Sequence, residues 1–203
     1  MLLRALPPLA ISLVMTLAIL RPAAADTFVR DDIVTDPDPA HFSVCHEHGC
    51  AEVDQIGLSP QEWRSIQQLF SRTAMSPEME RQYIARAIAR FETFVGRRTG
   101  TWNDKGGDLK GLGLDGQMDC IDESTNTTTY LRILQGARLL RWHTVEDRAT
   151  RGWFIRGWPH TTAVIRDTRS GELYAVDSWF EDNGKPPHIV PLQQWKDGWE
   201  PGG

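Results

Sequence analysis

Residues 160–177 read HTTAVIRDTRSGELYAVD, a pattern that predicts a β-hairpin. Residues 161–165 are rich in β-branched side chains, residues 167–171 have the composition of a turn, and residues 172–176 form the returning strand. Residues 188–192 can add a further strand. Because strands joined by a short turn run in opposite directions, the C-terminal part of the chain is expected to form an antiparallel sheet.

Two helices are indicated before this hairpin. Ser59-Pro60-Gln61-Glu62 is a capping box with proline at the first helical position, and it predicts a helix over residues 59–72. Ser76-Pro77-Glu78 opens a second helix, which Gly96 is expected to end. The apolar residues of this second helix recur at helical spacing, and they are Ile84, Ala87, Ile88, Phe91 and Val95.

A third helix is expected over residues 119–137, after a glycine-rich loop over residues 99–116. This placement puts Cys120 on the first turn of the helix. Helices followed by an antiparallel sheet define an α+β fold.

The N-terminus has the three parts of a cleavable export signal over residues 1–25. Arg4 supplies the positive charge, Leu6 to Leu20 is almost wholly apolar, and Ala23-Ala24-Ala25 supplies the small residues before the cleavage point. The apolar run is shorter than the ~20 residues that a membrane-spanning helix needs. We therefore expect a mature protein without a membrane span, in the periplasm or secreted.

The rest of the chain is divided into an N-terminal arm over residues 26–58, which carries the loop between Cys45 and Cys50, and a domain over residues 59–203. The chain is acidic, with 22 Lys and Arg against 27 Asp and Glu. Nucleic acids and anionic lipid surfaces select basic patches, so this balance argues against both as partners. The sequence gives no indication of the oligomeric state.

Three cysteines are present: Cys45, Cys50 and Cys120. In an oxidising compartment cysteines pair where geometry allows, so we expect a disulfide between Cys45 and Cys50 and a free thiol at Cys120. An alternative is a metal site, because sulfur and imidazole are ligands for zinc and copper. The imidazoles beside the two thiols are those of His41, His46 and His48.

Cys120, His160 and Asp177 form a candidate catalytic group. A helix N-terminus favours a thiolate, and the start of one hairpin strand faces the end of the other, which makes His160 and Asp177 neighbours. A thiol nucleophile, a histidine base and a carboxylate that orients the histidine carry out acyl transfer. Gln117 and the backbone N–H of Cys120 are candidate oxyanion donors, and His143 is an alternative base.

The segment Gly116-Gln117-Met118-Asp119-Cys120-Ile121-Asp122 resembles the cysteine-bearing segment of bacterial transglutaminase-like cysteine proteinases. The stretches that begin at His160 and end at Asp177 look like the histidine and aspartate strands of the same superfamily, in the same order, and the likeness covers about residues 80–180. The resemblance implies a transglutaminase-like, papain-like core with a Cys120, His160 and Asp177 triad. It implies a cysteine peptidase or amidase that acts on a peptide or protein substrate in the cell envelope, without a cofactor or metal.

Alternatives to a thiol enzyme remain open. Carboxylates crowd the thiol at Asp119, Asp122 and Glu123, and their charge opposes a thiolate. The same fold without activity would be a binding module that holds a peptide or glycan in a tryptophan-lined groove, and a protein built on the Cys45 and Cys50 cluster would handle metal. The tryptophans concerned are Trp142, Trp153, Trp158, Trp179 and Trp195.

Overall fold

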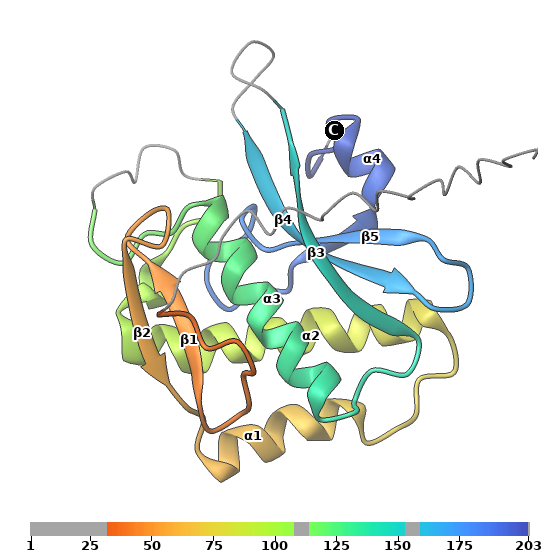
Figure 1. Ribbon diagram of the computed structural model, residues 1–203, viewed down its shortest axis with the longest axis horizontal. Coiled ribbons are helices and arrows are strands. Elements are labelled where there is room, and N and C mark those ends of the chain that lie inside the picture. Colours follow the sequence, from red (N-terminus) through yellow and green to blue (C-terminus); the bar gives the residue numbers. More distant parts are fainter. Residues whose placement is uncertain (1–31, 108–113, 153–158, 203) are drawn as a thin grey trace, which may run out of the picture.

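The computed structural model describes residues 32–107, 114–152 and 159–202, and the export signal expected over residues 1–25 lies outside these ranges. The chain is α+β, as predicted. A four-stranded antiparallel sheet in the order β3-β4-β5-β6 and a separate hairpin, β1-β2, accompany the helices (Figure 1). No helix in the described part is both long enough and apolar enough to cross a membrane.

The two N-terminal helices begin where the capping signals place them. Helix α1 spans Pro60–Gln67, and Ser59 and Glu62 cap each other's backbone N–H groups as a capping box. Helix α2 spans Pro77–Thr99 and ends at Gly100, which has φ 81°. The expected end at Gly96 is wrong: Gly96 is buried inside the helix, where a Cβ would lie 3.0 Å from the backbone of Trp102. It is glycine because another segment packs closely against it.

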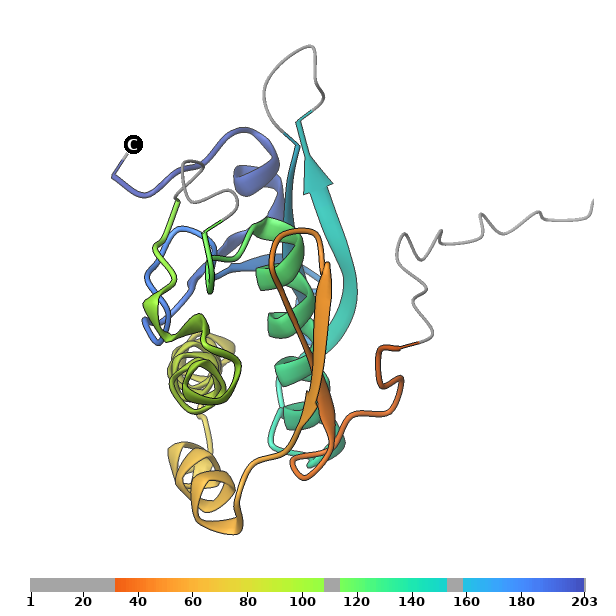
Figure 2. The same ribbon diagram turned by 90° about the vertical axis from the view of Figure 1, so that its left-hand side faces the viewer.

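Helix α3 spans Cys120–Gly136 and lies between α2 and the four-stranded sheet, and it also contacts β1 (Figure 2). Its N-cap is Asp119, which forms a capping box with Asp122. The helix buries a polar run over residues 122–129, which is unusual for a central helix. Hydroxyls satisfy part of this run internally, since Thr125 and Thr128 each donate to the carbonyl four residues earlier at 2.7 Å.

The C-terminal sheet contains the predicted hairpin. Strand β4 spans His160–Asp167, β5 spans Leu173–Asp177, and the two pair antiparallel. Strand β6 spans His188–Pro191 at one edge, as expected. Strand β3, His143–Arg151, was not foreseen; it forms the other edge and carries a bulge between Glu146 and Ala149. A short helix, α4, spans Leu192–Lys196 and packs on β5 and β6.

The segment expected as an N-terminal arm forms the hairpin β1, Phe42–His46, and β2, Glu52–Ile56. Phe42 and Val44 are fully buried in the main hydrophobic core. The ring of Phe42 meets those of Phe91 and Tyr130 edge-on, at 6.3 and 6.1 Å between centroids. Strand β1 is therefore part of the core of the domain, and a hairpin precedes the helices that the sequence placed first.

Candidate active site

Cys120 is the first residue of α3 and is half-buried, and it is the free cysteine of the described chain. Its Sγ lies against the backbone at the start of β4. The thiol donates to the carbonyl of Pro159 at 3.9 Å, and the backbone N–H of Thr161 points to the sulfur. These two contacts flank His160 in the chain, so the folded structure brings the cysteine helix to the histidine strand.

His160 and Asp177 are adjacent, as the hairpin predicts. His160 Nε2 lies 2.7 Å from Asp177 Oδ2, and both side chains are buried. A carboxylate accepts hydrogen bonds, so this contact places the proton of a neutral imidazole on Nε2 and leaves a lone pair on Nδ1. His160 Nδ1 is itself buried and has no hydrogen-bond partner among the described residues. The ring is therefore oriented by one nitrogen and has the other available for a proton.

Trp195 is a third member of this contact that the sequence reasoning did not identify. It lies on α4, is fully buried, and donates from Nε1 to Asp177 Oδ2 at 2.6 Å. The guanidinium of Arg151 stacks over the indole at 4.6 Å from its centroid. The contact of Trp195 with Asp177 becomes visible only when α4 is placed in the fold. In the sequence, Trp195 cannot be told from an aromatic residue of the core.

The aromatic rings of Trp179 and Phe180 complete the surroundings of His160. Their centroids lie 4.8 and 5.3 Å from that of the imidazole, and that of Trp195 lies at 5.5 Å. Trp153 and Trp158 lie outside the described residues. The histidine therefore has aromatic rings on several sides, and these limit the access of water to its hydrogen bond with Asp177.

The thiol of Cys120 is not activated in this arrangement. Burial raises its pKa to about 11, and the negative charges of Asp119 and Asp177 act in the same direction. The N–H of Thr161 lowers the pKa but does not outweigh them. The sequence suggested that the helix N-terminus would favour a thiolate; burial reverses this effect, because a charged sulfur loses more hydration than the helix end returns.

Gln117, the candidate oxyanion donor, lies three residues before the thiol and is buried. Its Nε2 donates to the carbonyl of Asn103 at 3.0 Å, and its Oε1 accepts from the backbone N–H of Lys105 at 3.1 Å. The amide thereby joins the segment before α3 to the loop after α2. One of its two Nε2 protons is engaged in this contact.

A second link joins the strand end at Asp177 to the cysteine helix. Ser178 donates to Glu123 Oε2 at 2.6 Å, and its oxygen lies 2.9 Å from the hydroxyl of Thr127. Glu123 and Thr127 are on α3, so the residue next to Asp177 is bonded one turn below Cys120. Glu123, which the sequence suggested only as a charge opposing the thiolate, has a structural contact here.

Further acids lie buried beneath the site. Burial raises the pKa of Glu92 to about 8 and that of Asp104 to about 7, and it also raises the pKa of Glu123 well above its usual range. Asp104 Oδ1 accepts from the backbone N–H of Met118 at 2.6 Å, and Glu92 Oε2 accepts from that of Gly184 at 2.9 Å. At neutral pH a substantial part of this cluster carries protons.

The alternative residues from the sequence lie elsewhere. His143 pairs with Asp167, at the end of the β3-β4 ladder opposite to His160, and its Nδ1 lies 2.9 Å from Glu80 Oε1. Cys45 and Cys50 form the predicted disulfide, with 4.6 Å between their Cα atoms, which removes both thiols as metal ligands. Within the described ranges, no group of three or more His, Cys, Asp or Glu side chains has a metal-binding arrangement.

Comparisons of the chain with models of protein families, with curated proteins and with solved structures found no match. The assignment of the site therefore depends on its geometry.

Proposed function

We propose that this protein is an exported cysteine hydrolase, a peptidase or amidase with a transglutaminase-like, papain-like core. The observation that carries the proposal is the orientation of His160. Asp177 holds Nε2 at 2.7 Å, Nδ1 has no partner among the described residues, and the thiol of Cys120 contacts the backbone of Pro159, the residue before His160. The histidine–carboxylate half of a cysteine, histidine and carboxylate triad is thus in place, and the proposal assigns the unpartnered Nδ1 to the thiol of Cys120.

In the proposed reaction, His160 Nδ1 takes the proton of Cys120 as the sulfur attacks the carbonyl carbon of an amide or ester. The new C–S bond forms while the carbonyl electrons move to oxygen, for which the backbone N–H of Cys120 and the amide of Gln117 are the candidate donors. When the tetrahedral intermediate collapses, the bond to the leaving amine or alcohol breaks. That group takes the proton from Nδ1, and an acyl-enzyme remains.

Water then hydrolyses the acyl-enzyme. His160 Nδ1 accepts a proton from water as its oxygen attacks the acyl carbon. The C–S bond then breaks, the carboxylic acid leaves, and the sulfur takes the proton from Nδ1 to become the thiol again. Because the resting thiol has a pKa of about 11, loss of its proton is expected to accompany attack and not to precede substrate binding. We propose hydrolysis over transfer to an amine, because water is abundant and the sequence indicates no amine site.

The proposed location is the periplasm or the extracellular space. The disulfide between Cys45 and Cys50 supports it, because such bonds persist in oxidising compartments. A peptide or protein of the cell envelope is the proposed substrate.

A second candidate is an inactive binding module of the same fold. One observation favours it: the thiol of Cys120 donates to the carbonyl of Pro159 and makes no hydrogen bond with His160 Nδ1 in the described structure. Such a protein would bind the same class of ligand without cleaving it.

The test is labelling of the purified protein with a thiol-directed peptide probe, followed by mass spectrometry of the labelled residue. Wild type is expected to label at Cys120, and the rate is expected to fall at least about tenfold in His160→Ala. Cys120→Ala is the control for labelling elsewhere. Equal labelling of wild type and His160→Ala, together with undiminished binding of a peptide by Cys120→Ala, would support the binding module instead.

A further inference from the structure

The loop closed by the Cys45–Cys50 disulfide has an unusual backbone. Four consecutive residues, Glu47 to Cys50, have positive φ angles of 63°, 62°, 66° and 56°, and among them only Gly49 is a glycine. Residues with a side chain adopt this region at an energetic cost and remain there only where their surroundings hold them. The loop is therefore held in its conformation by contacts and by the bond that closes it.

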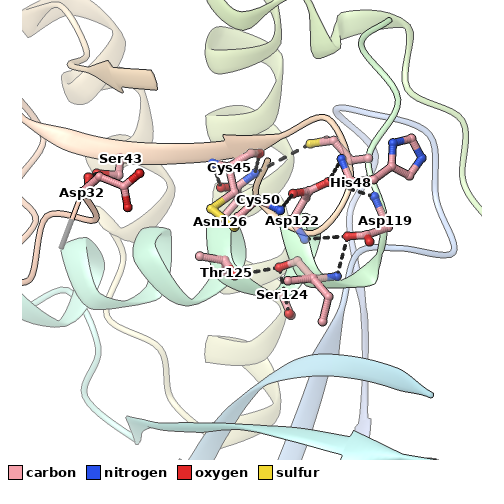
Figure 3. Close-up of a disulfide and its surroundings, with 12 residues drawn as sticks. Asp32, Ser43, Cys45, His48, Cys50, Asp119, Asp122, Ser124, Thr125 and Asn126 are labelled. Atoms are coloured by element: carbon pink, nitrogen blue, oxygen red, sulfur yellow. Dashed lines mark hydrogen bonds between the residues drawn. A yellow bond between two sulfur atoms is a disulfide. The ribbon is translucent and has the colours of Figure 1, made fainter. Parts of the chain in front are cut away.

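Its backbone amides surround a carboxylate of the cysteine helix. Cys50 N donates to Asp122 Oδ1 at 2.6 Å, and His48 N donates to Asp122 Oδ2 at 2.8 Å (Figure 3). Successive N–H groups in turn conformations form a concave site for an anion, and here the anion is a side chain of the protein. Asp122 is completely buried, so these amides replace the water that a carboxylate otherwise requires.

The same carboxylate holds the turn that carries Cys120. Asp122 Oδ2 accepts from the backbone N–H of Asp119 at 3.1 Å, which closes the N-terminus of α3. Two further contacts bind the loop to this part of the chain. Asn126 accepts from the N–H of Cys45 at 2.7 Å and donates to its carbonyl at 2.8 Å, and Glu47 Oε1 accepts from the N–H of Gly116 at 3.1 Å.

We propose that the disulfide loop, defined as residues 45–50, is a redox-sensitive latch that positions Cys120 through Asp122. With the disulfide closed, the left-handed residues keep both amides on Asp122, and Asp122 fixes the first turn of α3. Reduction by a dithiol adds two electrons and two protons: the S–S bond breaks, Cys45 and Cys50 become thiols, and the dithiol becomes a disulfide. The open loop relaxes, and the buried carboxylate loses two of the three amides that hold it.

This inference depends on the proposed function only in so far as Cys120 is the nucleophile. A displacement of about 1 Å at a reacting group lowers a rate by about 100-fold. We therefore expect loss of the latch to slow reaction at Cys120 while the rest of the domain remains folded, because the loop amides of His48 and Cys50 bind Asp122 on α3, whereas β4 and β5 are held by their own antiparallel ladder.

The test compares the whole chain with the disulfide intact and the double variant Cys45→Ser, Cys50→Ser. Amide hydrogen exchange is measured along the chain, and the rate of iodoacetamide modification at Cys120 is followed by mass spectrometry as a function of pH. In the variant, we expect exchange over residues 118–123 to be about tenfold faster or more, exchange in β4 and β5 to be unchanged, and the pH profile of Cys120 to shift. Treatment of wild type with a dithiol under native conditions should give the same pattern.

The control is His48→Asn, which keeps the backbone amide and tolerates a positive φ; it should match wild type. Unchanged exchange at residues 118–123 in the double variant overturns the latch, and so does a uniform loss of protection over the whole domain, which would make the disulfide a general stabiliser. If wild type shows no hydrolysis, the proposed function fails, but the exchange pattern still decides the latch. If wild type is active and exchange is unchanged, only the latch fails.

Discussion

Trp195 donates its indole N–H to Asp177 at 2.6 Å, on the same carboxylate oxygen that lies 2.7 Å from His160 Nε2. Asp177 Oδ2 thus receives two hydrogen bonds, one from the strand histidine and one from the tryptophan of α4. The second bond fixes the direction of the carboxylate, which in turn fixes the imidazole ring.

Replacement of Trp195 by Phe removes this donor and keeps most of the aromatic volume. A hydrogen bond to a charged group contributes about 1.5–3 kcal/mol, so we expect the rate of the His160-dependent reaction at Cys120 to fall about tenfold or more. The loss should be greater than in Trp199→Phe, whose ring contacts Phe180 and His188 and which serves as the matched control. Equal rates in the two variants would show that the indole N–H has no part in orienting Asp177.

Asp119→Asn is expected to make the resting thiol more reactive. Asparagine is as good an N-cap as aspartate, so the start of α3 should be retained, whereas the negative charge that raises the pKa of Cys120 is lost. The pKa should fall below about 11, and iodoacetamide modification at pH 8 should become several-fold faster, because the rate follows the thiolate fraction. Rates measured from pH 6 to 11 check this. A profile unchanged from wild type would mean that the charge of Asp119 does not reach the sulfur.

Asp122→Asn, by contrast, should not be read as the removal of an opposing charge alone. The Asp122 carboxylate accepts hydrogen bonds from the backbone N–H groups of His48, Cys50 and Asp119. In asparagine one of the two oxygens is replaced by an NH₂ group, which is itself a donor and would lie against a backbone N–H donor. We expect a lower melting temperature and altered exchange at the start of α3. This differs from the simple charge argument that the sequence suggests, in which the change would only speed modification of Cys120.

The buried acids predict that the protein loses stability as the pH rises. The pKa values of Glu92 and Asp104 in the folded state, about 8 and about 7, are above their usual values, so the native state binds protons more tightly than the unfolded chain. Their favourable contribution to the free energy of unfolding is fully present below about pH 4, and it is lost as the pH rises through 7 to 8. Other groups unfold many proteins in acid, so the melting temperature should be compared from pH 5 to pH 9, where it is expected to fall by several degrees.

Glu92→Gln tests the origin of this dependence. The neutral amide can keep the acceptor for the N–H of Gly184 but never takes the buried charge. The variant should match wild type near pH 5, be more stable at pH 9, and show a flatter profile. Glu52→Gln, at an exposed position on β2, is the control and should reproduce the wild-type profile. Parallel profiles for Glu92→Gln and wild type would contradict the assignment.

Gly96→Ala tests the close packing against α2, and Gly136→Ala in α3 is its control. In Gly96→Ala the new Cβ would lie 2.8 Å from Asn183 Oδ1 and 3.0 Å from the backbone of Trp102, so we expect a loss of about 1–3 kcal/mol in unfolding free energy. At Gly136, within α3, nothing lies within 4 Å of a Cβ, and Gly136→Ala should be neutral or stabilising by up to about 1 kcal/mol. Urea denaturation of both variants provides the comparison.

Local signals allowed much of the fold to be predicted. Capping boxes at Ser59 and the helix start near Asp119 are encoded within four residues, and the hairpin that joins His160 to Asp177 is encoded within eighteen. The strands that were missed have weak patterns, since β2 is half-exposed and β3 is a charged edge strand with a bulge. The end of α2 was misplaced because Gly96 is required by the close packing of Trp102 and Asn183 against the helix, and a local sequence pattern does not show such a contact.

The site was predictable where it depends on strand pairing and unpredictable where it depends on distant contacts. The pair His160 and Asp177 follows from the hairpin, and the disulfide from the spacing of two cysteines. The contact of Trp195 with Asp177 needs the position of α4, and that of Asp122 with the disulfide loop spans more than seventy residues. The raised pKa of Cys120 follows from burial, which the sequence did not reveal.

The dependence of Asp177 on α4 also sets an order of events during biosynthesis. A chain made N-terminus first contains Cys120, His160 and Asp177 before Trp195 is added. Until α4 has packed, the carboxylate has only one of its two donors and the imidazole is not held in place. If the chain is the hydrolase proposed above, its site is completed only when the last helix has folded.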